Sequence, residues 1–434
     1  MRVCGVYFVF VILLSACTNG VSHLDIALQQ AKHNKAELEK VLKHFKHDSL
    51  KYRAACFLIE NMPGKYSILP YDSLDRYKNF LKIIPQNDPI SWDVRYSKIW
   101  HGFDSISKRQ LAGFSKIEDI KVITGDYLIK NIEYSFKIWE NGKIKDYCSF
   151  DEFCHYILPY RIDHEPLSDW REEGFQKFGH LLDSLMSPRE LALRIIKLGG
   201  MRYNIGMTKY PYKQSYAEML QTRWGTCDDM AAFLALSLRA IGIPASIDYV
   251  PAWANRSSSH CWNVVKDATG DFIEVGYGPE GKNEVVYKIS KIYRKKYDIP
   301  LCDVTSEYAM PLSDLTFRVP SQKDKQLISL CTFNNHDWVP VALSKVMNGS
   351  VLFESVGRGI LWGDNQIRTY LNEGKGIVFL AFISQKGRLN NKPIGFPVIL
   401  LEDGTIKELC ASTEKESIIP VSYTHLRAHE TRGN

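Results

Sequence analysis

The segment that most constrains the fold of this chain is the run Arg223-Trp224-Gly225-Thr226-Cys227-Asp228-Asp229-Met230. Thr226 followed three residues later by Asp229 has the pattern of a capping box, in which two side chains satisfy backbone N–H groups at a helix start. Apolar residues then recur with helical spacing until Gly242 and Pro244. The sequence therefore predicts a helix that begins at Cys227 and ends near Gly242.

A cysteine in the first turn of a helix lies beside unpaired backbone N–H groups and the positive end of the helix dipole, which favour the thiolate. The thiolate is the form needed for covalent cysteine catalysis. Asp228 and Asp229 act against it, because a negative charge disfavours a second anion nearby. A basic partner is therefore required, and His260 is the candidate. Without further context, Cys227 is equally compatible with a small buried apolar residue.

The order of these motifs resembles the transglutaminase-like superfamily. Three elements carry the resemblance: Gly-x-Cys at the start of a helix, Arg-x-x-Gly-Ile-Pro from Arg239 to Pro244, and His-x-Trp at His260. The resemblance covers about residues 187–278 and implies a papain-like core in which Cys227 attacks a carboxamide or peptide carbonyl. His260 would then serve as base and acid. The family aspartate on the following strand corresponds to Gly276 here.

Residues 260–265 and 271–277 are predicted to form two strands of a hairpin. The register of this hairpin determines which residues lie near His260. The expected register places His260 opposite Gly276, with Glu274 on the same face as His260 and one diagonal step away. Glu274 is therefore the candidate third catalytic residue. An ordinary solvent-facing carboxylate is an equally good interpretation, since a register change of one residue reverses the face.

Two further expectations concern the neighbourhood of the nucleophile. Cys261 directly follows His260 on the strand and is expected to point to the opposite face, so it is not a rival nucleophile. The oxyanion formed during acyl transfer requires the backbone N–H of Cys227 and one upstream donor, for which Gln221 and Trp224 are candidates.

The N-terminus predicts export from the cytoplasm. A short apolar run leads to Leu14-Ser15-Ala16-Cys17, typical of a secretory signal and shorter than the roughly 20 residues of a membrane span. Leu-Ser-Ala-Cys resembles the bacterial lipoprotein signal, which implies lipidation of Cys17 and anchoring in the cell envelope. The outer membrane is favoured because no aspartate follows Cys17, and the periplasmic and surface faces both stay open.

Composition excludes several other classes of protein. The 434 residues, 45% of them hydrophobic, can build more than one core. The net charge of +6 comes from intermixed charges without a basic block, so no nucleic acid is expected as a partner. The 10 cysteines are too few for a disulfide scaffold, although Cys148 and Cys154 could form a bridge. Neither a metal nor a cofactor motif is found.

The region before the core shows helical periodicity from His23 to Asn61. Residues 148–171 resemble the helical region that precedes the core in transglutaminase-like lipoproteins of the Bacteroides group. In this region Arg161, Glu165 and Arg171 are candidates for lining a substrate cleft, while ion-paired surface residues are the more ordinary interpretation.

We expect an α+β protein with a papain/transglutaminase-like core between a helical region and a β-sandwich. The sandwich is inferred from short apolar strands separated by Gly, Asn and Asp turns. The expected segments are a signal peptide (1–16), a mainly helical domain (17–186), the core (187–295), the sandwich (296–420) and a tail that resembles translated adapter sequence and is not native (421–434).

The leading interpretation is a lipid-anchored enzyme. Cys227 would form a thioester and His260 would protonate the leaving amine. Release by water makes the protein a peptidase or amidase, which we favour, and release by an amine makes it a crosslinking acyltransferase. The alternative is a catalytically inactive binding module for glycan or peptide. The expected partners are a peptide or protein substrate, with glycan as a further option, and the membrane through Cys17.

Overall fold

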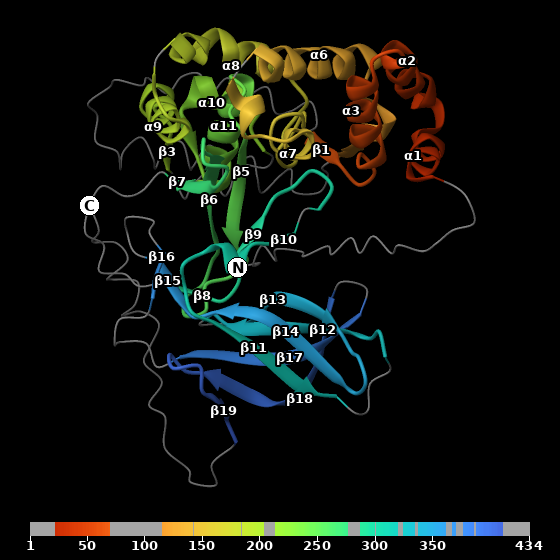
Figure 1. Cartoon of the computed structure of the whole chain (residues 1–434). Coiled ribbons are helices and arrows are strands. Elements are labelled where there is room, and N and C mark those ends of the chain that lie inside the picture. Colours follow the sequence, from red (N-terminus) through yellow and green to blue (C-terminus); the bar gives the residue numbers. More distant parts are fainter. Residues whose placement is uncertain are drawn as a thin grey trace, which may run out of the picture.

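The computed structural model describes residues 22–69, 115–141, 143–183, 185–203, 213–276, 287–299, 301–319, 324–334, 337–361, 367–369, 376–385 and 388–410. Helices gather at one end of the molecule and strands at the other, which confirms the expected α+β class (Figure 1). Within these ranges, no helix combines the length and apolar character needed to cross a membrane. Cys17 and residues 421–434 lie outside the described ranges.

The N-terminal helices begin where polar side chains cap them. Ser22 forms a capping box with Asp25, and the Asp48 carboxylate accepts from the backbone N–H of Lys51 at 3.1 Å. The apolar faces of the helices meet in one core that includes Leu38 and Leu58. The helices are α1 (His23–Ala31), α2 (Lys35–Phe45), α3 (Ser49–Glu60) and α6 (Gly125–Asn141).

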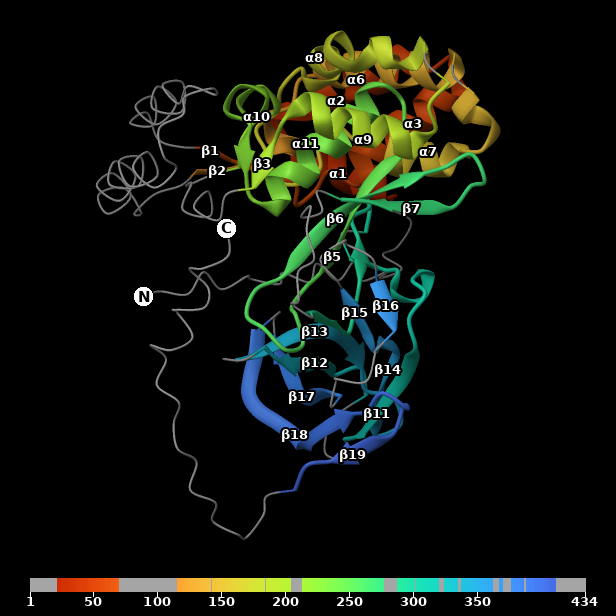
Figure 2. The same cartoon turned by 90° about the vertical axis from the view of Figure 1, so that its left-hand side faces the viewer.

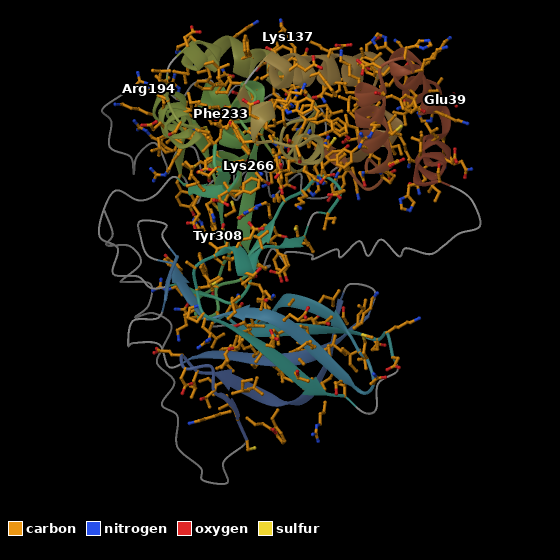
Figure 3. All side chains as sticks on the ribbon, in the orientation of Figure 1. Glu39, Lys137, Arg194, Phe233, Lys266 and Tyr308 are labelled. Carbon is orange, nitrogen blue, oxygen red and sulfur yellow. The ribbon has the colours of Figure 1, made fainter. Side chains whose placement is uncertain are left out.

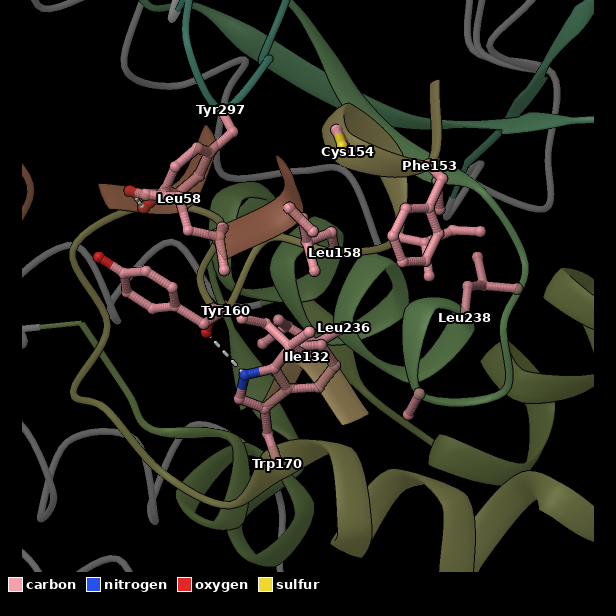
Figure 4. Close-up of a cluster of buried hydrophobic side chains, with 14 of the residues drawn as sticks. Leu58, Ile132, Phe153, Cys154, Leu158, Tyr160, Trp170, Leu236, Leu238 and Tyr297 are labelled. Carbon is pink, nitrogen blue, oxygen red and sulfur yellow. Dashed lines mark hydrogen bonds between the residues drawn. The ribbon is translucent and has the colours of Figure 1, made fainter. Parts of the chain in front are cut away.

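Helix α11 (Cys227–Ala240) is the central helix of the molecule, and every residue from Asp229 to Ala240 is buried. Helices α8 and α9 and strands β5 and β6 pack on it. Figure 4 shows Leu236 and Leu238 of this helix among aromatic and apolar side chains of the N-terminal region. The surrounding helices are α7 (Phe150–Tyr156), α8 (Trp170–Phe178), α9 (Pro188–Gly199) and α10 (Tyr216–Thr222).

A capping box is present at the start of α9, where Ser187 and Glu190 cap one another and Pro188 occupies the first turn. Each apolar side chain buried in this core contributes on the order of 1.5–3 kcal/mol relative to exposure. The buried side of α9 therefore fixes its position against α11.

The central sheet is antiparallel and has the strand order β10-β9-β5-β6-β7. Strands β5 and β6 are its longest members and extend from the helical end towards the C-terminal strands (Figure 2). The strands are β5 (Ala245–Val250), β6 (His260–Lys266), β7 (Phe272–Val275), β9 (Tyr293–Arg294) and β10 (Cys302–Asp303).

The C-terminal strands form a sandwich in which a five-stranded sheet, β13-β12-β17-β18-β19, faces the pair β11-β14. Apolar side chains from both sheets, among them Phe353 and Phe379, fill one shared core. The strands are β11 (Leu312–Arg318), β12 (Leu327–Phe333), β13 (Trp338–Lys345), β14 (Ser350–Gly357), β17 (Ile377–Gln385), β18 (Arg388–Leu400) and β19 (Ile406–Glu408).

The loop that precedes β6 packs against the sandwich. Ala252 and Ala254 of this loop are buried in the sandwich core, and the Ala254 N–H donates to the Lys288 carbonyl at 2.9 Å. Lys288 lies on β8 (Tyr287–Ile289), which pairs with β15 (Gly359–Leu361), itself paired with β16 (Ile367–Thr369). The residues just before His260 are therefore held by the C-terminal part of the molecule.

The charged residues proposed for a substrate cleft have a different role. Arg161, Glu165 and Arg171 are only 4–5% exposed, so they are not surface residues, and Glu165 lines a narrow cavity together with Asp228 and Lys213. Arg171 donates to three successive carbonyls from residue 157 to residue 159. A buried guanidinium with five donors can satisfy several loop carbonyls at once. The residues Cys148 and Cys154, considered for a disulfide, are free thiols.

Candidate active site

Cys227 is the first residue of α11, as the sequence predicts. The Thr226 N–H and Oγ1 donate to Asp229 Oδ2 at 2.8 and 2.9 Å, and the Asp229 N–H donates to Thr226 Oγ1 at 3.4 Å. This confirms the capping box. The first-turn N–H groups of a helix have no carbonyl four residues earlier to accept their hydrogen bonds. They can therefore stabilise a negative charge that develops near the Cys227 side chain.

Gly225 allows the chain to pass close to this helix start. It lies in β4 (Trp224–Gly225), which pairs in parallel with β3 (Arg202–Tyr203). A Cβ atom at this position would lie 2.5 Å from the Asp229 Cβ, closer than real Cβ atoms approach. A larger residue would therefore displace either β4 or the capping carboxylate.

The thiol of Cys227 interacts non-covalently with the side chains of two consecutive residues of β6, His260 and Cys261. Hydrogen bonds with Cys261 and with His260 lower the pKa of Cys227 to about 5, against the opposite effects of burial and of Asp228. The first-turn position of the cysteine favours the same direction. Cys227 is therefore a thiolate at neutral pH, and its counterpart is the His260 imidazole.

The position of Cys261 agrees with the sequence expectation. Cys261 packs with Ala231 and Ala235 of α11, whereas the His260 ring lies beside Trp253 and Trp262. The two side chains therefore leave the strand on opposite faces, as alternation predicts. The hydrogen bond with Cys227, together with burial, raises the pKa of Cys261 well above its usual value. Cys261 is thus a protonated neighbour of the nucleophile.

Lysines counter the negative charge beside the nucleophile. Lys213 Nζ lies 3.7 Å from an Asp228 carboxylate oxygen, and Lys295 Nζ lies 3.2 Å from Asp163 in the same narrow cavity. Burial raises the pKa of Asp228, but Lys213 and Lys295 outweigh it and hold that pKa below its usual value. Asp228 also accepts from Cys261 Sγ at 3.5 Å. The lysines offset the repulsion that Asp228 exerts on the thiolate.

The strand register moves Glu274 away from His260. The sequence analysis places His260 opposite Gly276, whereas the structure pairs Asn263 with Val275 and Val264 with Glu274. This shift of two residues leaves Glu274 on the predicted face but four residues along the strand from His260, about 13 Å away. Glu274 therefore does not contact the imidazole. Burial, and then Asp248, raise the pKa of Glu274 to about 7.

His260 is flanked by aromatic rings. Its ring centroid lies 5.8 Å from that of Trp253, with 25° between the planes, and 6.1 Å from that of Trp262, with 37° between the planes. In the described ranges, no carboxylate is hydrogen-bonded or paired with His260. No local sequence pattern relates Trp253 to the histidine, so sequence reasoning missed this contact.

The proposed oxyanion donors lie just before Cys227. Trp224 donates its backbone N–H to Thr222 Oγ1 at 3.4 Å, and its carbonyl accepts from the Gln214 side chain at 2.8 Å. Gln221 is an exposed residue of α10. Gln214, which sequence reasoning missed, fixes the segment before Cys227, and the oxyanion roles of Gln221 and Trp224 stay predictions.

A buried ion pair stabilises the central sheet. Arg294 Nε and Nη2 donate to the two carboxylate oxygens of Asp248 at 2.8 and 2.9 Å. Tyr308 donates to Asp248 at 2.6 Å and accepts from Trp262 Nε1 at 2.9 Å. The sequence signal for this buried pair is Asp248, a charged residue inside the mainly apolar run Ala-Ser-Ile-Asp-Tyr-Val.

Comparison with known proteins supports the resemblance for one part of the chain. Residues 180–276 match the family model described as the Transglutaminase-like superfamily, and this span includes both Cys227 and His260. None of the curated proteins compared with the chain matches it.

One solved structure, a candidate cysteine protease from Cytophaga hutchinsonii, aligns with 52% of this chain and 53% of its own length. The chain thus spans about half of that protein. Sequence identity is 12% and the TM-score is 0.21. Such a TM-score does not establish a shared arrangement, so the family-model match alone carries the similarity.

Proposed function

We propose that the transglutaminase-like segment is a cysteine acyl-transfer enzyme that acts on peptide or carboxamide bonds. The observation that supports the proposal is the joint position of Cys227 and His260. One side chain begins a buried helix, the other begins a strand, and the interaction with His260 helps to lower the pKa of Cys227. A thiolate paired with an imidazolium is the starting state for thioester formation.

The reaction proceeds in two steps. Cys227 Sγ attacks the carbonyl carbon, and the charge that forms on the carbonyl oxygen faces the first-turn N–H groups of α11. The His260 imidazolium gives its proton to the leaving amine, so that the carbon–nitrogen bond breaks and a thioester remains. His260 then takes a proton from the incoming nucleophile, whose oxygen or nitrogen displaces the sulfur and restores the thiolate.

We propose hydrolysis as the outcome of the second step. An amine in place of water would give transamidation. The second candidate function is a binding module for peptide or glycan, with the fold retained but catalysis lost. It is favoured by the strand register, in which Glu274 pairs with Val264 rather than lying near His260. The resemblance to the family, which places Gly276 where an aspartate is expected, points the same way.

Alkylation of Cys227 by iodoacetamide separates these functions, with the modified peptide quantified by mass spectrometry. Because folding lowers the pKa of Cys227 to about 5, the thiolate persists as pH falls to that value. We expect alkylation between pH 6 and 7 to be at least tenfold faster than for free cysteine. His260→Ala should slow it, whereas His44→Ala on the exposed side of α2 should not.

If alkylation is no faster than for free cysteine and does not depend on His260, the enzyme proposal is wrong. The binding module would then be the remaining candidate function. If the thiolate is reactive, peptide substrates are incubated with and without a primary amine donor. Release of free acid in the presence of the amine indicates a peptidase or amidase, while an amine adduct indicates transamidation. Cys227→Ala should abolish either product.

We also propose that the chain is held in the bacterial cell envelope, with the outer membrane favoured, through lipid on Cys17. The support is the Leu-Ser-Ala-Cys motif after the short apolar run. Metabolic labelling with an alkyne-tagged fatty acid tests this directly. Labelled protein is expected from the wild type, and Cys17→Ser should be unlabelled and released. Equal labelling of the two proteins would overturn the proposal.

A further inference from the structure

We propose that Trp253 is a positioning residue for His260, and that the indoles of Trp253 and Trp262 take over the role of the carboxylate that the site lacks. This inference rests on the proposed acyl-transfer function. In a Cys-His-Asp arrangement, the carboxylate orients the imidazole and stabilises its protonated form. The structure provides another group in contact with the same ring.

The contact geometry suits this role. The indole plane of Trp253 is within 25° of the imidazole plane, at a centroid separation of 5.8 Å. A ring stacked in this way resists rotation of the imidazole about its Cβ–Cγ bond. A cation within about 6 Å of an indole centroid is also attracted by the ring quadrupole, and tryptophan is the strongest such partner. Trp253 therefore stabilises the imidazolium without an anion.

Trp253 is itself held rigidly. Its side chain is 4% exposed, its backbone N–H donates to the Ser258 carbonyl at 3.2 Å, and its ring lies 4.7 Å from that of Tyr287 on β8. The Arg256 guanidinium lies over the Tyr287 ring, 5.3 Å from its centroid. The indole thus has one position against the histidine, set by the loop and by β8.

Trp262 is fixed from the other direction. Its Nε1 donates to Tyr308 Oη at 2.9 Å, and Tyr308 donates to the buried carboxylate of Asp248 at 2.6 Å. Figure 3 places Tyr308 at the junction between the helical end and the sandwich. The charged group that interacts with His260 is Cys227 from α11, and the neighbouring carboxylate of Asp228 is paired with Lys213. No part of this arrangement requires Glu274.

The test replaces Trp253 by Leu and by Phe in the full chain. Leu keeps an apolar side chain in the buried position but has no π face, whereas Phe keeps a smaller π face. Alkylation of Cys227 at pH 6.5 should be about tenfold slower in Trp253→Leu and largely restored in Trp253→Phe. Trp338→Ala, on β13 of the sandwich, is the control and should leave the rate unchanged.

A double-variant comparison shows whether Trp253 acts through His260. In a His260→Ala background, Trp253→Leu should cause no further loss, because the group it positions is absent. An equal loss in both backgrounds, or a Trp253→Leu rate within twofold of wild type, would overturn the inference. A wild-type thiol that does not respond to His260→Ala would instead overturn the proposed function, so the two failures are distinguishable. Melting temperatures of all variants exclude loss of folding as the cause.

Discussion

At the scale of single residues, the reactivity of Cys227 depends on opposing neighbours. Asp228 disfavours the thiolate, while the imidazole of His260 and the thiol of Cys261 favour it. Cys261 has one proton, and Asp228 Oδ1, 3.5 Å from its sulfur, competes for that proton. The histidine can donate without such competition. The thiolate therefore depends on Cys261 and on His260 together.

Glu274 provides a pH prediction at the same scale. Burial raises its pKa from 4.5 to about 7, so the folded protein binds this proton more tightly than the unfolded chain. The resulting stability is lost as pH rises from 4.5, and the full penalty is present above about 7. We expect Glu274→Gln to raise the free energy of unfolding at pH 8 by about 2 kcal/mol, allowing for partial exposure.

Urea unfolding of wild type and Glu274→Gln at pH 4 and pH 8 measures this effect. The two proteins should be nearly equally stable at pH 4, where the wild-type carboxyl is protonated in both states. Asp271→Asn on the exposed turn before β7 serves as the control and should show no comparable gain. A gain of the same size at both pH values would contradict the titration.

At the scale of elements, the start of α11 depends on a close approach that only glycine permits. Gly225→Ala would bring a Cβ within 2.5 Å of the Asp229 Cβ. We expect a loss of about 1–3 kcal/mol from overpacking, with slower alkylation of Cys227 because the helix start shifts. Urea unfolding and the alkylation rate together measure the two effects.

Helix α9 provides the matched comparison, since it begins with an equivalent capping box at Ser187 and Glu190. Ser187→Ala should cost about 1 kcal/mol and leave the alkylation of Cys227 unchanged. If Gly225→Ala kept the wild-type alkylation rate, the close contact at Asp229 would not be what holds the nucleophile in place.

At the scale of the whole molecule, the core and the sandwich share the support of His260. The loop before β6 is buried in the sandwich core through Ala252 and Ala254, and Lys291 Nζ donates to the Glu354 carbonyl of β14 at 2.6 Å. The sandwich is thus part of the framework of the site, whether or not it also binds a ligand.

The Asp248–Arg294 pair joins two neighbouring strands of the central sheet, β5 and β9. Asp248 is fully buried, and removing one partner of a buried pair leaves an unpaired charge that costs about 3–5 kcal/mol. Asp248→Ala should therefore lower the free energy of unfolding by that amount, as measured by urea denaturation. Glu39→Ala, which removes an exposed pair with Lys35, should change it by less than 1 kcal/mol. Similar losses in both variants would contradict the assigned role.

The sequence alone was sufficient for the features that depend on local spacing. The Thr226–Asp229 capping box, the helix from Cys227 to the Gly242 region, and the capped start of α9 follow from residues three or four apart, which neighbour each other in any helix. The strand-rich C-terminal region follows equally from short apolar runs between turns. These interactions need no knowledge of distant parts of the chain.

Only the tertiary structure decided which side chains meet around His260. The register of β7 differs by two residues from the expected one, because a hairpin is positioned by packing on both faces and by its turn, not by alternation alone. Trp253, Lys213 and Lys295 come from segments far apart along the chain, and no local pattern relates them to the cysteine. Local spacing fixed the helix and its nucleophile, whereas long-range packing selected the neighbours that set its charge.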